Sequence, residues 1–296
     1  MGILLSGGRS PRARLRELLA APAPLIAPGA YDALSARLIE QAGFDAVYMT
    51  GFGTTASLLG RPDVGLLSGA EMVDNARRIV AAVDVPVIAD ADTGYGNAIN
   101  VLRTVQLYEQ AGVAGIQLED QVMPKKCGHM SGKALIGADE MVGKLRAAVE
   151  ARTDPDLLII ARTDAVAVQG LDEAIGRAKA FADAGADLLF VEAPTSEEDI
   201  ATVAGELAGV APLVFNWAEG GRTPPLSYER IAELGFALVI YPIGTLLAAT
   251  AGIRSLLASL KADGVPSLSG LPTFGEFTDL VGLPEVQELE QRYSGT

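Results

Sequence analysis

The sequence predicts an α/β protein with a (β/α)8 TIM-barrel fold, and three observations support this prediction. Eight short apolar runs alternate with helical patterns along the chain. The runs are apolar throughout, as expected of parallel strands covered on both faces. The length of 296 residues suits a single barrel of eight β/α units. An open, doubly wound sheet is the alternative, but eight repeated units favour closure.

A glycine ends the helical pattern before four of the runs. The segments are 41-QAGFDAVYMT-50, 110-QAGVAGIQLE-119, 183-DAGADLLFVE-192 and 233-ELGFALVIYP-242. Their glycines are expected just after helix ends, where a left-handed backbone is least costly for glycine. Proline introduces the other four runs, as it can at the first residue of a strand. These runs are 24-PLIAPG-29, 86-PVIADAD-92, 155-PDLLIIARTD-164 and 212-PLVFNW-217.

The chain continues well beyond the eighth run. Residues 246–264 show a helical pattern, and residues 273–293 exceed what a barrel requires. We therefore expect one barrel domain over residues 1–296, with residues 265–296 as a C-terminal helical extension. The extra helix either packs on its own barrel or serves a contact between subunits.

Composition limits the possible partners and location. The net charge of −14 disfavours nucleic acid, which needs a basic face, but allows a small anionic substrate in a locally positive pocket. A single cysteine excludes an intrachain disulfide and fits a reducing, cytoplasmic setting. No apolar run reaches roughly 18 residues, so no membrane contact through a spanning helix is expected. The arginine-containing segment 1–16 lacks the order of a signal peptide.

Carboxylates follow two neighbouring predicted strands at their C-terminal ends, which form the active-site face of such barrels. Asp90 and Asp92 lie two residues apart, so their side chains point to one face of a strand, and Glu119 ends the next strand. Three such carboxylates repel one another unless a cation lies between them. Oxygen ligands suit Mg²⁺, with Mn²⁺ as a possible substitute. Helix capping is the alternative role for each aspartate.

Arg162 ends an otherwise apolar predicted strand. Its planar guanidinium group suits bidentate binding of a carboxylate or phosphate. The alternative is an internal ion pair with Glu192 or another strand-end acid, and the two roles are compatible.

The connection 121-QVMPKKCGHMSGKALIG-137 is long for a segment between strand and helix, which suggests a lid. It carries the only cysteine, Cys127, and the only histidine, His129, beside Lys125, Lys126 and Lys133. Nearby cations are expected to lower the pKa of the Cys127 thiol below its usual value of about 8.5. The side chain could then act as a nucleophile, base or acid. A mobile surface loop with an incidental cysteine is the alternative.

Five motifs resemble the isocitrate lyase/phosphoenolpyruvate mutase superfamily, along nearly the whole chain. They are 47-VYMTGFGTTAS-57, 88-IADADTGYG-96, 117-QLEDQVMPKKCGH-129, 161-ARTDA-165 and 216-NWAEGGRTP-224. The combination of KKCGH with DxDxGYG is specific to the family. The resemblance implies a (β/α)8 barrel whose last helix is exchanged between subunits, usually within a homotetramer built as a dimer of dimers. It also implies bound Mg²⁺ and a substrate with a 2-oxo-acid or 2-hydroxy-acid portion.

The resemblance implies roles for individual residues. Thr50, Gly51 and Phe52 would hold a substrate carboxylate through hydroxyl and backbone N–H donors. Asp90, Asp92 and Glu119 would bind Mg²⁺ directly or through water. Arg162 would stabilise an enolate oxygen, and Cys127 would be the acid or base on a closing loop. Lys125, His129 and Glu119 are the other implied catalytic residues, and Tyr48, Asp63, Gly128, Glu192 and Asn216 would also contact substrate.

The implied activity is a Mg²⁺-dependent carbon–carbon lyase. It would cleave a 2-hydroxy di- or tricarboxylate, of the 2-alkylmalate or 2-methylisocitrate type, to pyruvate or another 2-oxo acid plus a carboxylate. After the last strand, 241-YPIGTLLAAT-250 offers only Thr245 and Thr250 as polar side chains beyond the tyrosine, which favours a smaller dicarboxylate. The alternatives are a carboxyphosphonoenolpyruvate phosphonomutase and an oxaloacetate hydrolase or decarboxylase. A barrel kept only for binding would be expected to have lost Cys127 or one of the paired aspartates, and all are present.

Overall fold

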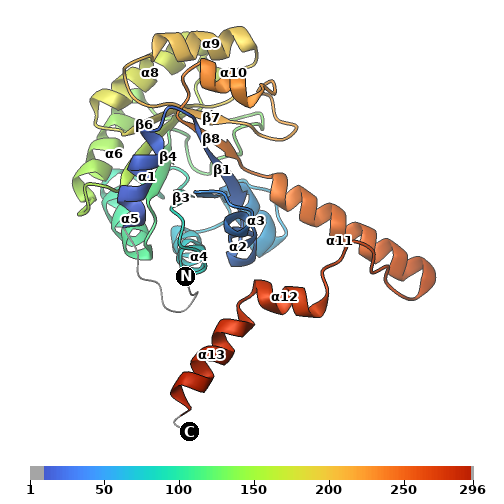
Figure 1. Cartoon of the computed structure of the whole chain (residues 1–296). Helices are drawn as coiled ribbons and strands as arrows, with labels where there is room; N and C mark the ends of the chain where they lie inside the picture. The colour runs from blue at the N-terminus through green and yellow to red at the C-terminus, as the bar shows by residue number, and fades with distance from the viewer. Residues whose placement is uncertain (1–9, 295–296) are drawn as a thin grey trace.

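Eight parallel strands form a barrel in the computed structural model, which describes residues 10–294 (Figure 1). The strands are β1 (Leu25–Ala30), β2 (Val47–Met49), β3 (Val87–Asp90), β4 (Gly115–Glu119), β5 (Leu158–Thr163), β6 (Leu188–Val191), β7 (Val214–Asn216) and β8 (Leu238–Tyr241). Sequential strands lie side by side, and β1 pairs with β8. A single bridge between Leu189 and Leu213 links β6 to β7. The predicted barrel is confirmed and the open sheet is wrong, because the first strand pairs with the last.

Helices connect the strands around the outside of the barrel (Figure 1). They are α2 (Ala33–Gln41), α4 (Gly69–Val80), α5 (Ala98–Ala111), α6 (Ala138–Ala151), α8 (Leu171–Asp183), α9 (Glu197–Glu206) and α10 (Tyr228–Glu233), with the short α3 (Gly51–Leu59) and α7 (Val166–Gln169) at two strand exits. The four glycines predicted to follow helices have φ angles of +89°, +92°, +99° and +82°. This left-handed conformation ends each helix and turns the chain toward the next strand.

The first described helix, α1 (Pro11–Leu19), closes the end of the barrel opposite the strand exits. Its fully buried Leu15 packs with Leu25, Ala46 and Leu158, which lie at or just before the starts of three strands. The apolar plug leaves only the C-terminal end of the barrel available for a polar site.

Side chains alternate between the inside and the outside of the barrel. Ala46 and Tyr48, Leu188 and Phe190, and Leu238 and Ile240 belong to the interior cluster. The intervening Val47, Leu189 and Val239 belong to the cluster between strands and helices. In each strand, the residue two positions after the last inward-facing apolar residue also points inward, so it lies in the mouth of the barrel. By this rule Thr50, Asp90, Arg162, Glu192 and Asn216 converge, each from a different strand.

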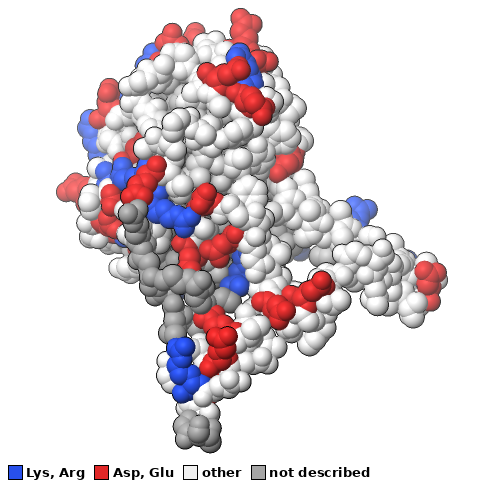
Figure 2. Space-filling model, in the orientation of Figure 1, with Lys and Arg blue, Asp and Glu red and all other residues white. Residues whose placement is uncertain are grey.

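The C-terminal part of the chain projects from the barrel in Figure 1 as α11 (Gly244–Asp263), α12 (Phe274–Leu280) and α13 (Leu283–Tyr293). None of these helices contains a buried residue. The charged residues of α11 are Arg254, Lys261 and Asp263, so this helix is mostly uncharged in Figure 2. The division into one domain with an extension over residues 265–296 stays a prediction. Within residues 10–294, no helix combines the length and apolar character needed to cross a membrane.

Candidate active site

A cavity of about 210 Å³ opens at the C-terminal ends of the strands, under the connection 121–137. Most residues predicted for the site line it: Tyr48, Phe52, Asp63, Asp90, Lys125, Cys127, Gly128, His129, Arg162, Glu192 and Asn216. The other predicted residues, Thr50, Gly51, Asp92 and Glu119, do not line the cavity, and the three that carry side chains are almost completely buried, at 2%, 3% and 2% exposure. Residues distant in sequence are thus assembled around one space.

The carboxylate of Asp90 is held by two backbone N–H groups. Its Oδ2 accepts from Gly51 N at 3.3 Å, and its Oδ1 accepts from Asp92 N at 3.1 Å. A Cβ atom at position 51 would lie 2.6 Å from Asp90 Oδ2, so only glycine permits this approach. Asp92 itself has a φ angle of +47°, an uncommon conformation that turns the chain just after β3.

Lys125 joins the second aspartate to a third. Its Nζ atom lies 2.8 Å from Asp92 Oδ1 and 2.7 Å from Asp63 Oδ2, and all three side chains are at most 4% exposed. Burial raises the pKa of Asp92 to about 6, although the Lys125 ammonium acts in the opposite direction. The lysine is therefore a fixed positive charge within this cluster of carboxylates.

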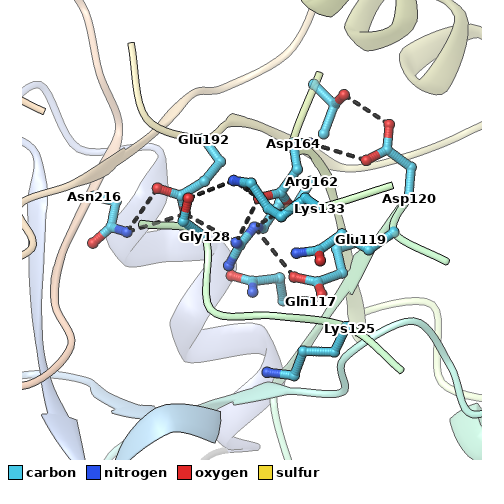
Figure 3. Close-up of polar contacts among 12 residues, drawn as sticks. Gln117, Glu119, Asp120, Lys125, Gly128, Lys133, Arg162, Asp164, Glu192 and Asn216 are labelled. Atoms are coloured by element: carbon cyan, nitrogen blue, oxygen red, sulfur yellow. Dashed lines mark hydrogen bonds and ion pairs between the residues drawn. The ribbon is translucent and has the colours of Figure 1, made fainter. Parts of the chain in front are cut away.

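The side chain of Glu119 lies close to Arg162 (Figure 3). Its Oε2 is 3.3 Å from Arg162 Nε, while its buried Oε1 accepts no hydrogen bond from the described residues. Burial raises the pKa of Glu119 well above its ordinary value, and the Arg162 cation opposes this shift. An unpaired buried carboxylate oxygen is costly unless a cation or water satisfies it.

These residues can accommodate a hydrated divalent cation. Asp63, Asp90, Asp92 and Glu119 offer only oxygen ligands, and they are buried. Lys125 pairs with Asp63 and Asp92, and Arg162 pairs with Glu119, so the carboxylates outnumber the cations beside them. Between residues 10 and 294, however, no three His, Cys, Asp or Glu side chains converge closely enough to enclose an ion by themselves. Mg²⁺ usually keeps several waters and needs only one or two carboxylates directly, so the donor set fits this ion.

The segment Thr50–Phe52 forms the N-terminus of α3. Thr50 caps this helix, and its Oγ1 accepts from Gly53 N at 3.2 Å. The N–H of Thr50 is bonded to Ala30 O, and that of Gly51 to Asp90. Two of the three backbone N–H groups in this segment are therefore already bonded within the protein, and its role in holding a substrate carboxylate stays a prediction. The Thr50 hydroxyl and the Phe52 N–H, which has no acceptor among residues 10–294, are the donors that remain.

Arg162 is surrounded by carboxylates (Figure 3). Its Nε and Nη2 lie 3.0 Å from the two oxygens of Asp164, and Nη2 lies 3.3 Å from Glu192 Oε2. The guanidinium also sits 5.2 Å from the centre of the Phe190 ring. Burial alone would raise the pKa of Asp164, but the Arg162 and Lys133 cations lower it to about 2. The internal ion pair considered for Arg162 is thus present and fixes its orientation.

The Cys127 thiol does not have the predicted low pKa. Burial raises its pKa to about 11, although a hydrogen bond from the His129 backbone N–H acts in the opposite direction. The nearby lysines are directed elsewhere: Lys125 to Asp63 and Asp92, Lys126 to Gly132 O, and Lys133 to Asp164 and Gly128 O. The prediction failed because these cations neutralise other partners, so the thiol stays protonated near neutral pH.

His129 is held in a defined tautomer. Its Nδ1 accepts from Arg222 N at 3.0 Å, so the ring proton belongs on Nε2, which lies 3.3 Å from Glu192 Oε1. Burial lowers the pKa of His129, while the Glu192 carboxylate opposes this effect. Asn216 Nδ2 donates to both oxygens of Glu192, at 3.3 and 3.2 Å. The connection 121–137 is thereby joined to the exits of β6 and β7.

Several residues around the site were not selected from the sequence. Asp164, Lys133, Asp120 and Arg177 form one buried network, in which Asp120 accepts from Thr163 Oγ1 and Arg177 Nη1. The position of Asp164 two residues after Arg162 was a usable signal, because both side chains share the inward parity. Arg177 gave none, since an arginine in a helix usually faces solvent. Met130, Ala218, Ile240, Pro242 and Ile243 form an apolar wall of the cavity.

Comparisons with known proteins identify relatives of this chain. The phosphoenolpyruvate phosphomutase family model matches residues 15–261. A 2,3-dimethylmalate lyase of Eubacterium barkeri is 50% identical over 95% of this chain and 98% of its own. A chloroplastic carboxyvinyl-carboxyphosphonate phosphorylmutase of Arabidopsis thaliana is 43% identical, covering 95% of this chain and 84% of its own. A 2-methylisocitrate lyase of Aeropyrum pernix is 44% identical, covering 95% and 90%.

Solved structures show the same relationship. Oxaloacetate acetylhydrolase in complex with 3,3-difluorooxalacetate superposes with a TM-score of 0.92 at 40% identity, covering 97% of this chain and 98% of the other. A 2,3-dimethylmalate lyase gives 0.92 at 42% identity, covering 98% and 97%. Phosphonopyruvate hydrolase in complex with oxalate and Mg²⁺ gives 0.88 at 34% identity, covering 96% and 99%. This chain belongs to the phosphoenolpyruvate mutase/isocitrate lyase superfamily.

Proposed function

We propose that this protein is a Mg²⁺-dependent carbon–carbon lyase that cleaves a 2-alkylmalate-type 2-hydroxy dicarboxylate to pyruvate or another 2-oxo acid plus a carboxylate. The observation that carries the proposal is the protonated thiol of Cys127, which lines the same cavity as Arg162 and Asp90. An acid, a guanidinium group and a set of oxygen ligands around one space are what a retro-aldol cleavage requires.

Asp90, Asp92 and Glu119 would hold the metal, directly or through water. Mg²⁺, or Mn²⁺ in its place, would stabilise negative charge that develops on the oxygens of the hydroxy acid. The related phosphonopyruvate hydrolase structure, which contains oxalate and Mg²⁺, supports this choice of ion. Lys125 would hold the carboxylates of Asp92 and Asp63 in place when the cation is absent.

Substrate binding would begin at the N-terminus of α3. Phe52 lines the cavity, and its N–H has no acceptor among residues 10–294, so it would donate to a carboxylate; the buried Thr50 hydroxyl would be a second donor. The helix end adds a favourable partial positive charge. Tyr48 projects from the strand below and donates to Gln117 Oε1 at 3.2 Å. Its burial raises its pKa well above the ordinary value, so it would remain a neutral hydroxyl in contact with substrate.

Cleavage would break the bond between C2 and C3 of the substrate. The 2-hydroxyl would pass its proton to a carboxylate of the site and become the carbonyl of the 2-oxo acid, while the electron pair of the broken bond forms the enolate of the departing carboxylate. Arg162, fixed by Asp164 and Glu192, would stabilise charge on this enolate. The Cys127 thiol would then protonate the carbon, and its high pKa would favour recovery of the proton from water.

The lining of the cavity supports a dicarboxylate with an alkyl branch. Among the described residues that line the cavity, two have Lys or Arg side chains, Lys125 and Arg162. Both are already paired with protein carboxylates. A third substrate carboxylate would therefore lack a cation. The apolar wall of Met130, Ala218, Ile240, Pro242 and Ile243 suits an alkyl group instead. The 50% identity to a 2,3-dimethylmalate lyase agrees with this choice.

Pyruvate release tests the proposal directly. The substrates would be 2,3-dimethylmalate, other 2-alkylmalates, 2-methylisocitrate, isocitrate and oxaloacetate, each with Mg²⁺ and a coupled lactate dehydrogenase. Release from a 2-alkylmalate, abolished by EDTA, is the expected result. Silence on every hydroxy acid would refute the lyase. That result would favour a carboxyphosphonoenolpyruvate phosphonomutase, which ³¹P NMR would test next. Consumption of oxaloacetate alone would instead favour an oxaloacetate hydrolase or decarboxylase.

We further propose a cytoplasmic homotetramer, a dimer of dimers in which α11 is exchanged between subunits. Leu247, Ile253 and Leu257 on this helix are 48%, 58% and 55% exposed. A largely apolar groove of about 450 Å³, lined by Ile26, Leu38, Phe44 and Tyr241 among others, lies open on the barrel at β1 and β8. If α11 of one subunit covered the groove of its partner, both apolar surfaces would be removed from water. Light scattering during gel filtration should give four times the chain mass; a monomer would contradict the exchange.

A further inference from the structure

Lys133 links residues 121–137, hereafter called the loop, to the barrel. Its side chain is 1% exposed, although it belongs to a surface segment. Its Nζ atom lies 2.7 Å from Asp164 Oδ1 and also donates to the carbonyl of Gly128 (Figure 3). One ammonium group therefore binds the middle of the loop and the exit of β5 at the same time. Burying a lysine this completely is costly unless charge and hydrogen bonds compensate it.

Asp164 is shared between Lys133 and Arg162. Its Oδ1 is 2.7 Å from Lys133 Nζ and 3.0 Å from Arg162 Nη2, and its side chain is 0% exposed. When the loop leaves the barrel, Asp164 must give up one of these two cations. Loop position and the surroundings of Arg162 are thus linked through a single carboxylate.

We propose that Lys133 is a positioning residue that latches the loop closed over the cavity, by binding Asp164 and the Gly128 carbonyl together. The latch places the Gly128 backbone against Arg162 and Glu192, where a Cβ atom would lie within 2.4 and 2.7 Å of them. It also brings Cys127, one residue earlier, over the cavity. Opening the loop costs the charge-assisted hydrogen bonds of Lys133, which are among the stronger polar contacts in proteins.

Cys127 is the only cysteine, so its alkylation reports the position of the loop. In the closed loop the thiol is partly buried and protonated. In an open loop it would be exposed, with a pKa near its free value of about 8.5. Iodoacetamide at pH 8 should therefore react mainly through the open form. The measurement needs neither substrate nor turnover, so it remains informative even if the proposed lyase activity is absent.

The test compares Lys133→Met with Lys126→Met in the full-length protein. Lys126 is next to Cys127, but among residues 10–294 its ammonium group bonds only to Gly132 O, within the loop. Lys133→Met should accelerate alkylation about tenfold, the size expected for losing one charge-assisted contact. Lys126→Met should stay within about twofold of the wild-type rate, as for a change without structural consequence.

The sign of the effect separates a latch from simple electrostatics. Removal of a nearby cation alone would raise the pKa of the thiol and slow alkylation. Acceleration in Lys133→Met, with restoration toward the wild-type rate in Lys133→Arg, supports the latch. A Lys133→Met rate equal to or below that of the wild type overturns it. Circular dichroism would check folding, and Lys133→Gln, judged by the same rates, replaces the Met variant if that variant does not fold.

Discussion

Gly128 lies directly against Arg162: a Cβ atom at position 128 would be 2.4 Å from the Arg162 Nη2 atom. The loop can therefore close over the guanidinium group only because this residue has no side chain. The glycine of the KKCGH motif is explained by a close approach between two parts of the site, rather than by an unusual backbone angle.

Gly128→Ala should lower kcat/KM by about hundredfold, because displacing a catalytic group by about 1 Å has effects of this size. The free energy of unfolding should change little, since the loop can relax outward. Gly137→Ala is the matched control, because nothing lies within 4 Å of the Cβ position there. Equal activity in the two variants would show that the close approach is not needed for turnover.

The Cys127 thiol should titrate with a midpoint of about 11 in the folded protein. A folded pKa above the unfolded value means that the thiol contributes stability below the unfolded pKa of about 8.5, and that this contribution is lost as pH rises toward 11. The thiolate absorbance near 240 nm, compared with that of Cys127→Ser, measures the midpoint. The difference in unfolding free energy between the two proteins should also shrink across this pH range. A midpoint near 8.5 or below would restore the thiolate hypothesis.

His129 should remain neutral in the folded protein down to a pH below 6.5, because burial lowers its pKa. A lowered pKa means that its contribution to stability is present above the unfolded value of 6.5 and is lost as pH falls below it. As the only histidine in the chain, it gives one imidazole signal in an NMR titration of the untagged protein. A midpoint above 6.5 would mean that an imidazolium pairs with Glu192 instead.

Asp92→Ala should reduce Mg²⁺-dependent turnover by more than about hundredfold, because a metal supplies several kcal/mol of charge stabilisation. Asp74→Ala is the control: this exposed aspartate on α4 pairs with Arg77 and Arg78 on its own helix, and turnover should be unchanged. Titrations with Mg²⁺ would compare both variants with the wild type. An unaltered Mg²⁺ dependence in Asp92→Ala would remove this residue from the metal site.

The barrel could be predicted because its signals are local. Apolar runs mark the strands, the glycines at positions 43, 112, 185 and 235 mark helix ends, and side-chain parity carries Asp90 and Arg162 to the barrel mouth. These features depend on residues close in the sequence, so no knowledge of distant contacts was needed.

The chemistry of the loop could not be predicted in the same way. Which carboxylate binds which lysine depends on segments that are separated in sequence: Lys125 reaches Asp63, and Lys133 reaches Asp164. Counting cations near Cys127 therefore gave the wrong direction for its pKa, because burial dominates once those cations are engaged elsewhere. The free donors at the start of α3 were likewise decided by Ala30 and Asp90, which the local motif does not contain.

Turnover of Cys127→Ser tests the proposed mechanism most directly. With the alkylmalate that the wild type cleaves, kcat should fall by about 10² to 10⁴, the usual contribution of a general acid, because a serine hydroxyl is a much weaker acid. Calorimetric Mg²⁺ binding should be unchanged, since Asp90, Asp92 and Glu119 are intact. Wild-type turnover in this variant would contradict the assignment of Cys127 as the acid.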